Sequence, residues 1–298
     1  MKICRFRRAD GSSGLGLVES GAVADVSAVL DELPAQRYPL PRHDLLVEAL
    51  PRLAPRIRAL AAASAERLPL ETLTLLAPVA NPGKIIGAPI NYEAHVAESK
   101  ADPGIAHGRS ITGIGDWGLF LKAGTALAGA GEGVRLRFAE RRSDHEMELA
   151  VVIGRRAVCV APSQALDHVA GYAIGLDMTL RGKEVHSWRK SIDSYAVLGP
   201  WLVTADEVAD PGALDLWLDV NGQPRQRSNT RHLVYGVARL IAWASAQYTL
   251  EPGDVIMTGT PEGVGPVVPG DVMECGIAGI GTMRVAVSAF ATPSGGNP

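Results

Sequence analysis

Two glutamates separated by one residue stand at the start of an apolar run and could bind a metal ion. The segment S-D-H-E-M-E-L-A-V-V-I-G predicts a buried strand, in which alternate side chains point to the same side. Glu146 and Glu148 would therefore project together, with Met147 on the opposite face. Two carboxylates this close repel each other unless a cation lies between them, and Mg²⁺, Mn²⁺ and Ca²⁺ prefer oxygen ligands. The alternative is a solvated strand end whose carboxylates face water.

A third carboxylate, Asp177, follows another apolar run, G-Y-A-I-G-L. An aspartate in such a place is commonly a turn former or a helix cap. If the two predicted strands are neighbours, Asp177 instead joins Glu146 and Glu148 as a third oxygen ligand. A site of carboxylates without histidine or cysteine favours Mg²⁺ or Mn²⁺ over zinc.

His95 and Glu98 form a second candidate pair, three residues apart in N-Y-E-A-H-V-A-E-S. On one helical turn they lie side by side, and a histidine next to a carboxylate can take a proton from water. An incidental pair on a surface helix is the alternative. The Gly-rich, polar segment 99–118 that follows predicts a loop that orders when ligand binds and excludes bulk water.

The rest of the chain predicts an α+β, mostly β protein. Residues 1–78 combine short strand-like pieces with a helical stretch, 43–68, which Pro51 and Pro55 are expected to divide into two short helices. Strands and turns dominate residues 79–290, with helices predicted near 163–169 and 232–248. We therefore predict a small N-terminal α/β domain (1–78), a catalytic domain (79–290) and a disordered tail (291–298).

Composition narrows the possible partners and the compartment. The chain has 298 residues and a formal net charge of −3, and it has no long Lys/Arg cluster, so nucleic acid and anionic membranes are not expected partners. No apolar run approaches the ~20 residues of a membrane span, and no apolar segment of a signal peptide follows the basic N-terminus. Three widely spaced cysteines argue against a disulfide framework. We predict a cytoplasmic protein.

From about residue 80 to 288 the chain resembles the fumarylacetoacetate hydrolase family. The pieces that carry the resemblance are, in chain order, KIIGAPINYEAHVAE, FLKAGTAL, DHEMELAVVIGRR, GYAIGLDMTLR, RKSIDSYAVLGPWLV, VNGQPRQ and LEPGDVIMTGTPEGVG. The resemblance implies a mixed β-sandwich roll that pairs as a homodimer, and a small N-terminal domain of the kind that many members carry. It also implies that Glu146, Glu148 and Asp177 hold a divalent metal.

The resemblance gives roles to further residues. It implies that His95 and Glu98 activate water from a mobile lid helix. It also implies that Lys190 lies beside the metal, where an ammonium group can stabilise a developing enolate or oxyanion. Without the resemblance, the sequence around Lys190 is equally consistent with a solvated lysine on a polar loop.

The same comparison predicts a substrate pocket lined by Lys122, Arg181 and Thr260. The segment T-G-T-P-E-G-V-G lacks the G-K-[ST] ending of a phosphate loop, so we interpret it as a rigid turn whose N–H groups, including that of Gly259, hold a substrate carboxylate. One departure concerns the family pattern R-D-x-Q, which here reads R-G-K-E from Arg181 to Glu184. Replacing Gln by Glu changes a donor into an acceptor, so the departure bears on substrate identity.

These residues together predict a metal-dependent hydrolase acting on carbon–carbon bonds in ketonic substances. The expected substrate is a 2,4-dioxo acid, an acylpyruvate-like β-diketone, and the expected cofactor is Mg²⁺ or Mn²⁺, with Ca²⁺ as a further candidate and no organic cofactor. Decarboxylases, isomerases and hydratases of 2-oxo acids in aromatic catabolism pass through a similar enolate and remain alternatives. An inactive metal-binding protein would be expected to lack His95, Glu98 or Lys190, and all three are present.

Overall fold

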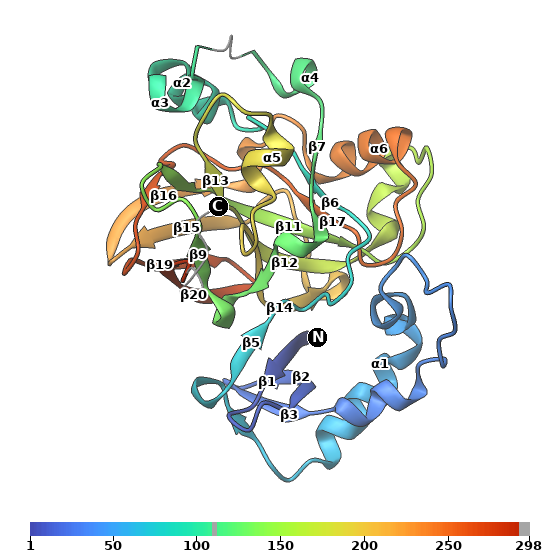
Figure 1. Cartoon of the computed structure of the whole chain (residues 1–298). Coiled ribbons are helices and arrows are strands. Elements are labelled where there is room, and N and C mark those ends of the chain that lie inside the picture. Colours follow the sequence, from blue (N-terminus) through green and yellow to red (C-terminus); the bar gives the residue numbers. More distant parts are fainter. Residues whose placement is uncertain (109–111, 292–298) are drawn as a thin grey trace.

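The computed structural model describes residues 1–108 and 112–291. Its largest element is a 12-stranded sheet whose main path runs β4-β3-β2-β1-β14-β12-β11-β17-β6-β7, with β5 added at β1 and β8 at β14. A five-stranded sheet, β16-β15-β19-β20-β9, and a three-stranded sheet, β13-β10-β18, complete the β structure (Figure 1). The prediction of a mostly β, mixed fold is confirmed.

The N-terminal strands extend the large sheet. They are β1 (Lys2–Arg7), β2 (Ser13–Glu19), β3 (Ala22–Asp25), β4 (Leu68–Pro69) and β5 (Thr74–Leu76). Strand β1 pairs antiparallel with β14 (Ala196–Thr204), with Lys2 opposite Val203. Because these backbones are hydrogen-bonded to each other, one sheet crosses residue 78, and the predicted domain boundary there stays a prediction.

The prediction of two short helices around Pro51 and Pro55 is wrong. A single helix, α1 (Leu45–Ala63), contains both prolines. Its N-cap is Asp44, whose carboxylate accepts hydrogen bonds from the N–H groups of Leu46 and Val47, as an N-cap side chain should. Its apolar stripe, Val47, Leu50, Leu53, Ile57 and Ala61, is buried, and this packing outweighs the backbone hydrogen bonds that the prolines remove.

The remaining strands of the large sheet surround the candidate ligands. They are β6 (Ile85–Gly87), β7 (Phe120–Lys122), β8 (Leu127–Gly129), β11 (Met147–Ile153), β12 (Val169–Asp177) and β17 (Val255–Met257). The five-stranded sheet consists of β9 (Val134–Leu136), β15 (Asp215–Val220), β16 (Gln223–Asn229), β19 (Val272–Ile277) and β20 (Gly281–Ala289). The small sheet consists of β10 (Ser143–His145), β13 (Thr179–Leu180) and β18 (Gly265–Val267).

Strand β11 is buried on both faces. Met147, Leu149, Val151 and Ile153 belong to a core cluster that includes apolar residues of β15, β19 and β20, whereas Ala150 and Val152 belong to a second cluster with the apolar stripe of α1. Alternate residues of one strand thus pack against two different layers, which explains why its sequence is a continuous apolar run.

Short helices surround this framework. They are α2 (Glu93–Ala101), α3 (Pro103–Ala106), α4 (Ile114–Trp117), α5 (His186–Lys190) and α6 (Val237–Gln247). The helix predicted near 163–169 is a 3₁₀ helix, Pro162–His168, and α6 begins after its N-cap Gly236, later than predicted. Helices α2, α3 and α4 lie at the end of the molecule opposite β1, β2, β3 and α1 (Figure 1). Except for Ala291, the predicted disordered tail lies outside the described residues.

No helix in the described ranges has the length and apolar character needed to cross a membrane.

Candidate active site

The three candidate ligand carboxylates meet at the ends of two neighbouring strands. Strands β11 and β12 pair antiparallel with Met147 opposite Leu176, and the Asp177 N–H donates to the Glu146 carbonyl at 2.8 Å. This pairing brings Asp177 beside the two glutamates. The sequence alone predicted this position only if the two strands were neighbours. One carboxylate oxygen from each of Glu146, Glu148 and Asp177 lies within 4.8 Å of the others, and all three residues are buried.

The spacing of these oxygens fits a divalent cation. A hard cation keeps ~2.0–2.6 Å from each oxygen, so two oxygens on the same ion are at most about 4–5 Å apart. The 4.8 Å limit on the three carboxylates is compatible with such an ion, and the set contains only oxygen donors. The residues present therefore suit Mg²⁺, Mn²⁺ or Ca²⁺ better than zinc.

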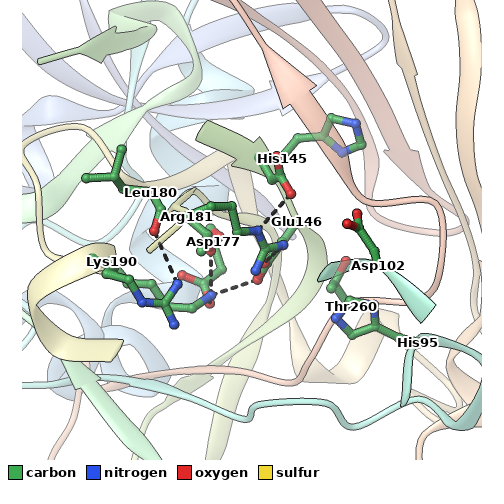
Figure 2. Close-up of polar contacts among 12 residues, drawn as sticks. His95, Asp102, His145, Glu146, Asp177, Leu180, Arg181, Lys190 and Thr260 are labelled. Atoms are coloured by element: carbon green, nitrogen blue, oxygen red, sulfur yellow. Dashed lines mark hydrogen bonds and ion pairs between the residues drawn. The ribbon is translucent and has the colours of Figure 1, made fainter. Parts of the chain in front are cut away.

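Buried cations surround the carboxylates, as Figure 2 shows. The Lys190 Nζ donates to Glu146 Oε2 at 2.7 Å, to Asp177 Oδ2 at 2.6 Å and to Thr179 Oγ1 at 2.7 Å. The guanidinium of Arg181 donates to Glu146 Oε1 at 2.8 Å. These bonds fix both carboxylates, and they place the Lys190 ammonium directly beside the candidate metal site.

Lys122 is a further buried lysine that binds Asp177. Its Nζ donates to the Asp177 carboxylate and, at 2.8 Å, to the Tyr195 carbonyl, and it is buried. Burial lowers the pKa of Lys122, and the nearby Lys190 charge lowers it further, while Asp177 opposes both. The predicted contact of Lys122 with substrate stays a prediction.

Glu146 and Glu148 have different electrostatic surroundings. Burial acts to raise the pKa of Glu146, but the Lys190 and Arg181 charges outweigh it and hold this pKa well below its usual value. Burial raises the pKa of Glu148 well above its usual value, and the Asp177 carboxylate adds to the effect. Glu148 accepts a hydrogen bond from the Gly259 N–H at 2.6 Å. Of the three candidate ligands, Glu148 is thus the one whose negative charge most needs a nearby cation.

His95 and Glu98 form the arrangement of an oriented base. The Nδ1 of His95 lies 2.8 Å from Glu98 Oε2, and the other oxygen of Glu98 accepts the Gly263 N–H at 2.9 Å. A carboxylate only accepts, so Nδ1 carries the proton in this bond and Nε2 is the nitrogen that can take one. His95 is only 4% exposed, which argues against an ordinary surface helix pair.

The T-G-T-P-E-G-V-G turn binds side chains of the protein itself. The N–H of Gly259 binds Glu148 and that of Gly263 binds Glu98, so one turn connects the candidate ligand set to the candidate base. Gly259 has a φ of +101°, and a Cβ there would come within 2.6 Å of Asn91 Cβ, so glycine is required. Binding of a substrate carboxylate by this turn stays a prediction.

The sequence did not single out Gln226, which positions Thr260. Its Nε2 donates to Thr260 Oγ1 at 2.8 Å and to the Pro261 carbonyl at 2.9 Å, and its Oε1 accepts the Met147 N–H at 3.1 Å. Gln226 lies in the V-N-G-Q-P-R-Q segment of the family resemblance, which was the available signal.

Asp144 and Arg142 were also missed. Arg142 donates from Nε and Nη2 to the two oxygens of Asp144 at 2.7 and 2.9 Å, and from Nη1 to Asp102 at 3.0 Å. Asp144 also accepts from Arg181 Nε at 2.7 Å. This chain of ion pairs runs from Glu146 to the end of α2. Acidic residues at every second position, 144, 146 and 148, were the signal in the sequence.

One pocket brings several of the candidate groups together. Its described lining residues include His95, Glu146, Arg181 and Lys190, together with Pro89, Ile90, Ser99, Ile105, Trp117, His186 and Arg189. Glu184, the residue that departs from the family pattern, does not line it. Its carboxylate pairs instead with Arg141 Nη1 at 3.0 Å, and the side chain is 37% exposed. Ion pairing with Arg141 lowers the pKa of Glu184.

The chain is similar in sequence and fold to known proteins. A family model described as the fumarylacetoacetate (FAA) hydrolase C-terminal domain matches residues 84–288. The maleylpyruvate hydrolase of Aquipseudomonas alcaligenes is 54% identical over 289 residues, which are 96% of this chain and 99% of that protein. The 2,4-didehydro-3-deoxy-L-rhamnonate hydrolase of Sphingomonas sp. (strain SKA58) is 36% identical and covers 97% of each chain.

A solved structure is similar over nearly the whole chain. The crystal structure of maleylpyruvate hydrolase from Sphingobium sp. SYK-6, in complex with manganese(II) and pyruvate, has a TM-score of 0.80 and 39% sequence identity, and the match covers 98% of this chain and 100% of that one. The chain therefore belongs to the fumarylacetoacetate hydrolase family. It is a metal-dependent hydrolase that cleaves a carbon–carbon bond in an acylpyruvate-type 2,4-dioxo acid, as its sequence predicted.

Proposed function

We propose that the chain hydrolyses maleylpyruvate to maleate and pyruvate, with Mn²⁺ or Mg²⁺ held by Glu146, Glu148 and Asp177. The observation that supports the proposal is the pocket whose described lining includes His95, Glu146 and Lys190, because an imidazole and an ammonium group then lie near the carboxylate set. The relative from Aquipseudomonas and the manganese in the Sphingobium structure support the choice of substrate and metal.

The bound cation would supply Lewis acidity and a template for the dioxo acid. Nε2 of His95 takes a proton from a water molecule that attacks the carbonyl remote from the pyruvate carboxylate, and Glu98 holds the imidazole in the required tautomer. The carbon–carbon bond then breaks, and the electron pair passes to the enolate of pyruvate. The Lys190 ammonium stabilises that negative charge, and the proton that His95 took from water passes to the enolate carbon, which gives pyruvate and restores the neutral imidazole.

A panel of acylpyruvates tests the proposal. Purified protein with Mn²⁺ or Mg²⁺ is expected to convert maleylpyruvate to maleate and pyruvate in equal amounts, with a chelator removing the activity. Products are identified by mass spectrometry. Release of CO₂, or an isomer of the substrate without pyruvate, would favour the decarboxylase or isomerase alternative instead.

The lid is expected to become ordered with ligand. Asp102, at the end of α2, is tied to the site through Arg142, whereas the polar faces of α2 and α3 are partly exposed. Residues 95–115 should therefore exchange amide hydrogens faster in the free protein than with a metal and oxalate. Of these, 109–111 lie outside the described residues. Equal exchange in the two states, measured by mass spectrometry, would argue against a lid.

We further propose a cytoplasmic homodimer that needs no organic cofactor. Cys4, Cys159 and Cys275 are free thiols, which suits a reducing compartment, and the dimer follows from the family resemblance. Light scattering on the purified protein measures the oligomeric state.

A further inference from the structure

Ser99 is a buried polar side chain that the proposed reaction does not use. It lies one helical turn after His95 on α2, so both side chains face the same pocket. Ser99 is fully buried, and its hydroxyl has no hydrogen-bond partner among residues 1–108 and 112–291. Buried hydroxyls in native proteins are nearly always hydrogen-bonded, because an unmet one costs free energy. A polar group of the ligand would supply the partner that Ser99 lacks.

Arg189 brings a guanidinium to the same pocket from α5. It is 3% exposed, and it donates from Nε to the Glu184 carbonyl at 2.8 Å and from Nη1 to the Leu180 carbonyl at 3.2 Å, a bond that Figure 2 marks at Leu180. These two bonds fix the plane of the guanidinium. A guanidinium held in one plane can bind a carboxylate through two parallel hydrogen bonds.

Aromatic rings of Trp117 and His186 line the same pocket, and Phe120 packs beside them. The His186 ring lies 5.2 Å from the Trp117 ring and 5.3 Å from the Phe120 ring, and the Lys190 ammonium lies 5.0 Å from the Phe120 ring centre. The ring planes are tilted by 47° and 35° to each other, and aromatic faces of this kind can pack against an unsaturated acyl chain.

The charges on the pocket wall favour a dianionic ligand. Its described lining includes three cationic side chains, Arg181, Arg189 and Lys190, and one carboxylate, Glu146. Arg181 and Lys190 both bind Glu146, so their charges serve the metal end of the pocket. Arg189 donates instead to the backbone carbonyls of Glu184 and Leu180.

We propose that Arg189 and Ser99 bind the carboxylate at the far end of the acyl chain and so select acylpyruvates that carry a second carboxylate. The proposal rests on the proposed function, because that reaction defines which end of the substrate lies at the metal. Arg189 and Ser99 are thereby specificity-determining residues, separate from the base and from the ligand set.

A matched pair of unreactive 2-oxo acids tests the subsite directly. 2-Oxoadipate and 2-oxohexanoate have the same chain length and differ in the distal carboxylate. Calorimetry on the Mn²⁺-loaded protein should show 2-oxoadipate binding about 10–100-fold more tightly, the range expected for hydrogen bonds to a charged group. Arg189→Gln should abolish this preference. Arg189→Lys keeps the positive charge but loses the planar guanidinium that can make two parallel hydrogen bonds, so it should retain part of the preference.

Ser99→Ala is the variant least able to disturb the fold. Alanine is the best helix former, and the Ser99 hydroxyl makes no hydrogen bond to the described residues that the substitution could remove. The substitution should lower the affinity for 2-oxoadipate about 3–10-fold and leave the affinity for 2-oxohexanoate nearly unchanged. Arg52→Gln removes an exposed charge from α1 and is the matched control, with no expected change. The ratio of kcat/KM for maleylpyruvate over acetylpyruvate should fall in parallel in the Arg189 and Ser99 variants.

The outcomes separate the two proposals. Equal affinity of the wild-type protein for both oxo acids, or an equal loss for both in the variants, overturns the subsite. If the wild-type protein prefers 2-oxoadipate and Arg189→Gln removes that preference, the subsite stands even if no acylpyruvate is cleaved. In that case the proposed function alone fails.

Discussion

Replacing Glu148 by glutamine is expected to abolish metal-dependent hydrolysis while the fold is retained. Glu148 is buried, and burial raises its pKa well above the usual value, so a neutral side chain of the same shape should be tolerated there. The amide oxygen can still accept the Gly259 N–H that Glu148 now accepts. The divalent cation, however, loses an anionic ligand. The affinity of the protein for the metal should therefore fall by more than ~100-fold, which is the largest loss usual when a residue that only supports a metal ligand is replaced.

Metal content and thermal unfolding together check this prediction. The wild-type protein should hold about one Mn²⁺ or Mg²⁺ per chain with oxygen ligands, and Glu148→Gln should hold almost none at the same free metal concentration. Circular dichroism should give a cooperative unfolding transition for both proteins. A variant that binds metal as tightly as the wild type would remove Glu148 from the ligand set.

Replacing His95 by alanine is expected to lower the hydrolysis of a diketone substrate by about 10²–10⁴-fold, the usual contribution of general base catalysis. The structure supports a specific role, because Glu98 orients His95 and the Gly263 N–H in turn holds Glu98. Metal binding should be unchanged, because the candidate ligand set consists of three carboxylates and does not include His95. Lys100→Ala, an exposed change on the same helix, is the matched control and should retain activity.

The same variant separates hydrolysis from the alternative reactions. Decarboxylation of a simple 2-oxo acid needs no activated water, so any such activity should lose much less than hydrolysis in His95→Ala. Lys190→Ala should impair both reactions, because both develop negative charge on an enolate oxygen. Diketone cleavage at the wild-type rate in His95→Ala would show that the His95–Glu98 pair is not the base, and the decarboxylase alternative would then lead.

The local patterns in this chain carried much information about the site. The two-residue spacing of Glu146 and Glu148 depends only on strand geometry, and the three-residue spacing of His95 and Glu98 depends only on helix geometry. Both pairs lie in the structure as those periods require, the first in the 4.8 Å carboxylate set and the second joined by a 2.8 Å hydrogen bond. The apolar run of β11 likewise predicted a buried strand, and every residue of β11 is buried in the structure.

Properties that depend on residues far apart in the chain could not be predicted in the same way. The sequence suggested Asp177 as a third ligand only if two strands were neighbours, and the pairing of β11 with β12 decided it. Packing of its apolar stripe kept α1 continuous through Pro51 and Pro55, against their local preference.

The second-carboxylate subsite depends most strongly on the tertiary structure. Ser99 and Arg189 are 90 positions apart in the numbering, and although each lies in or beside a recognised motif, no pattern in the sequence gave either of them a role. The sequence by itself determined the family, the reaction class and the candidate ligands, because short-range periodicity and motifs encode them. Only the tertiary structure decided which cations surround those ligands and which side chains meet across the pocket, because such contacts arise from strand pairing and helix docking over long separations.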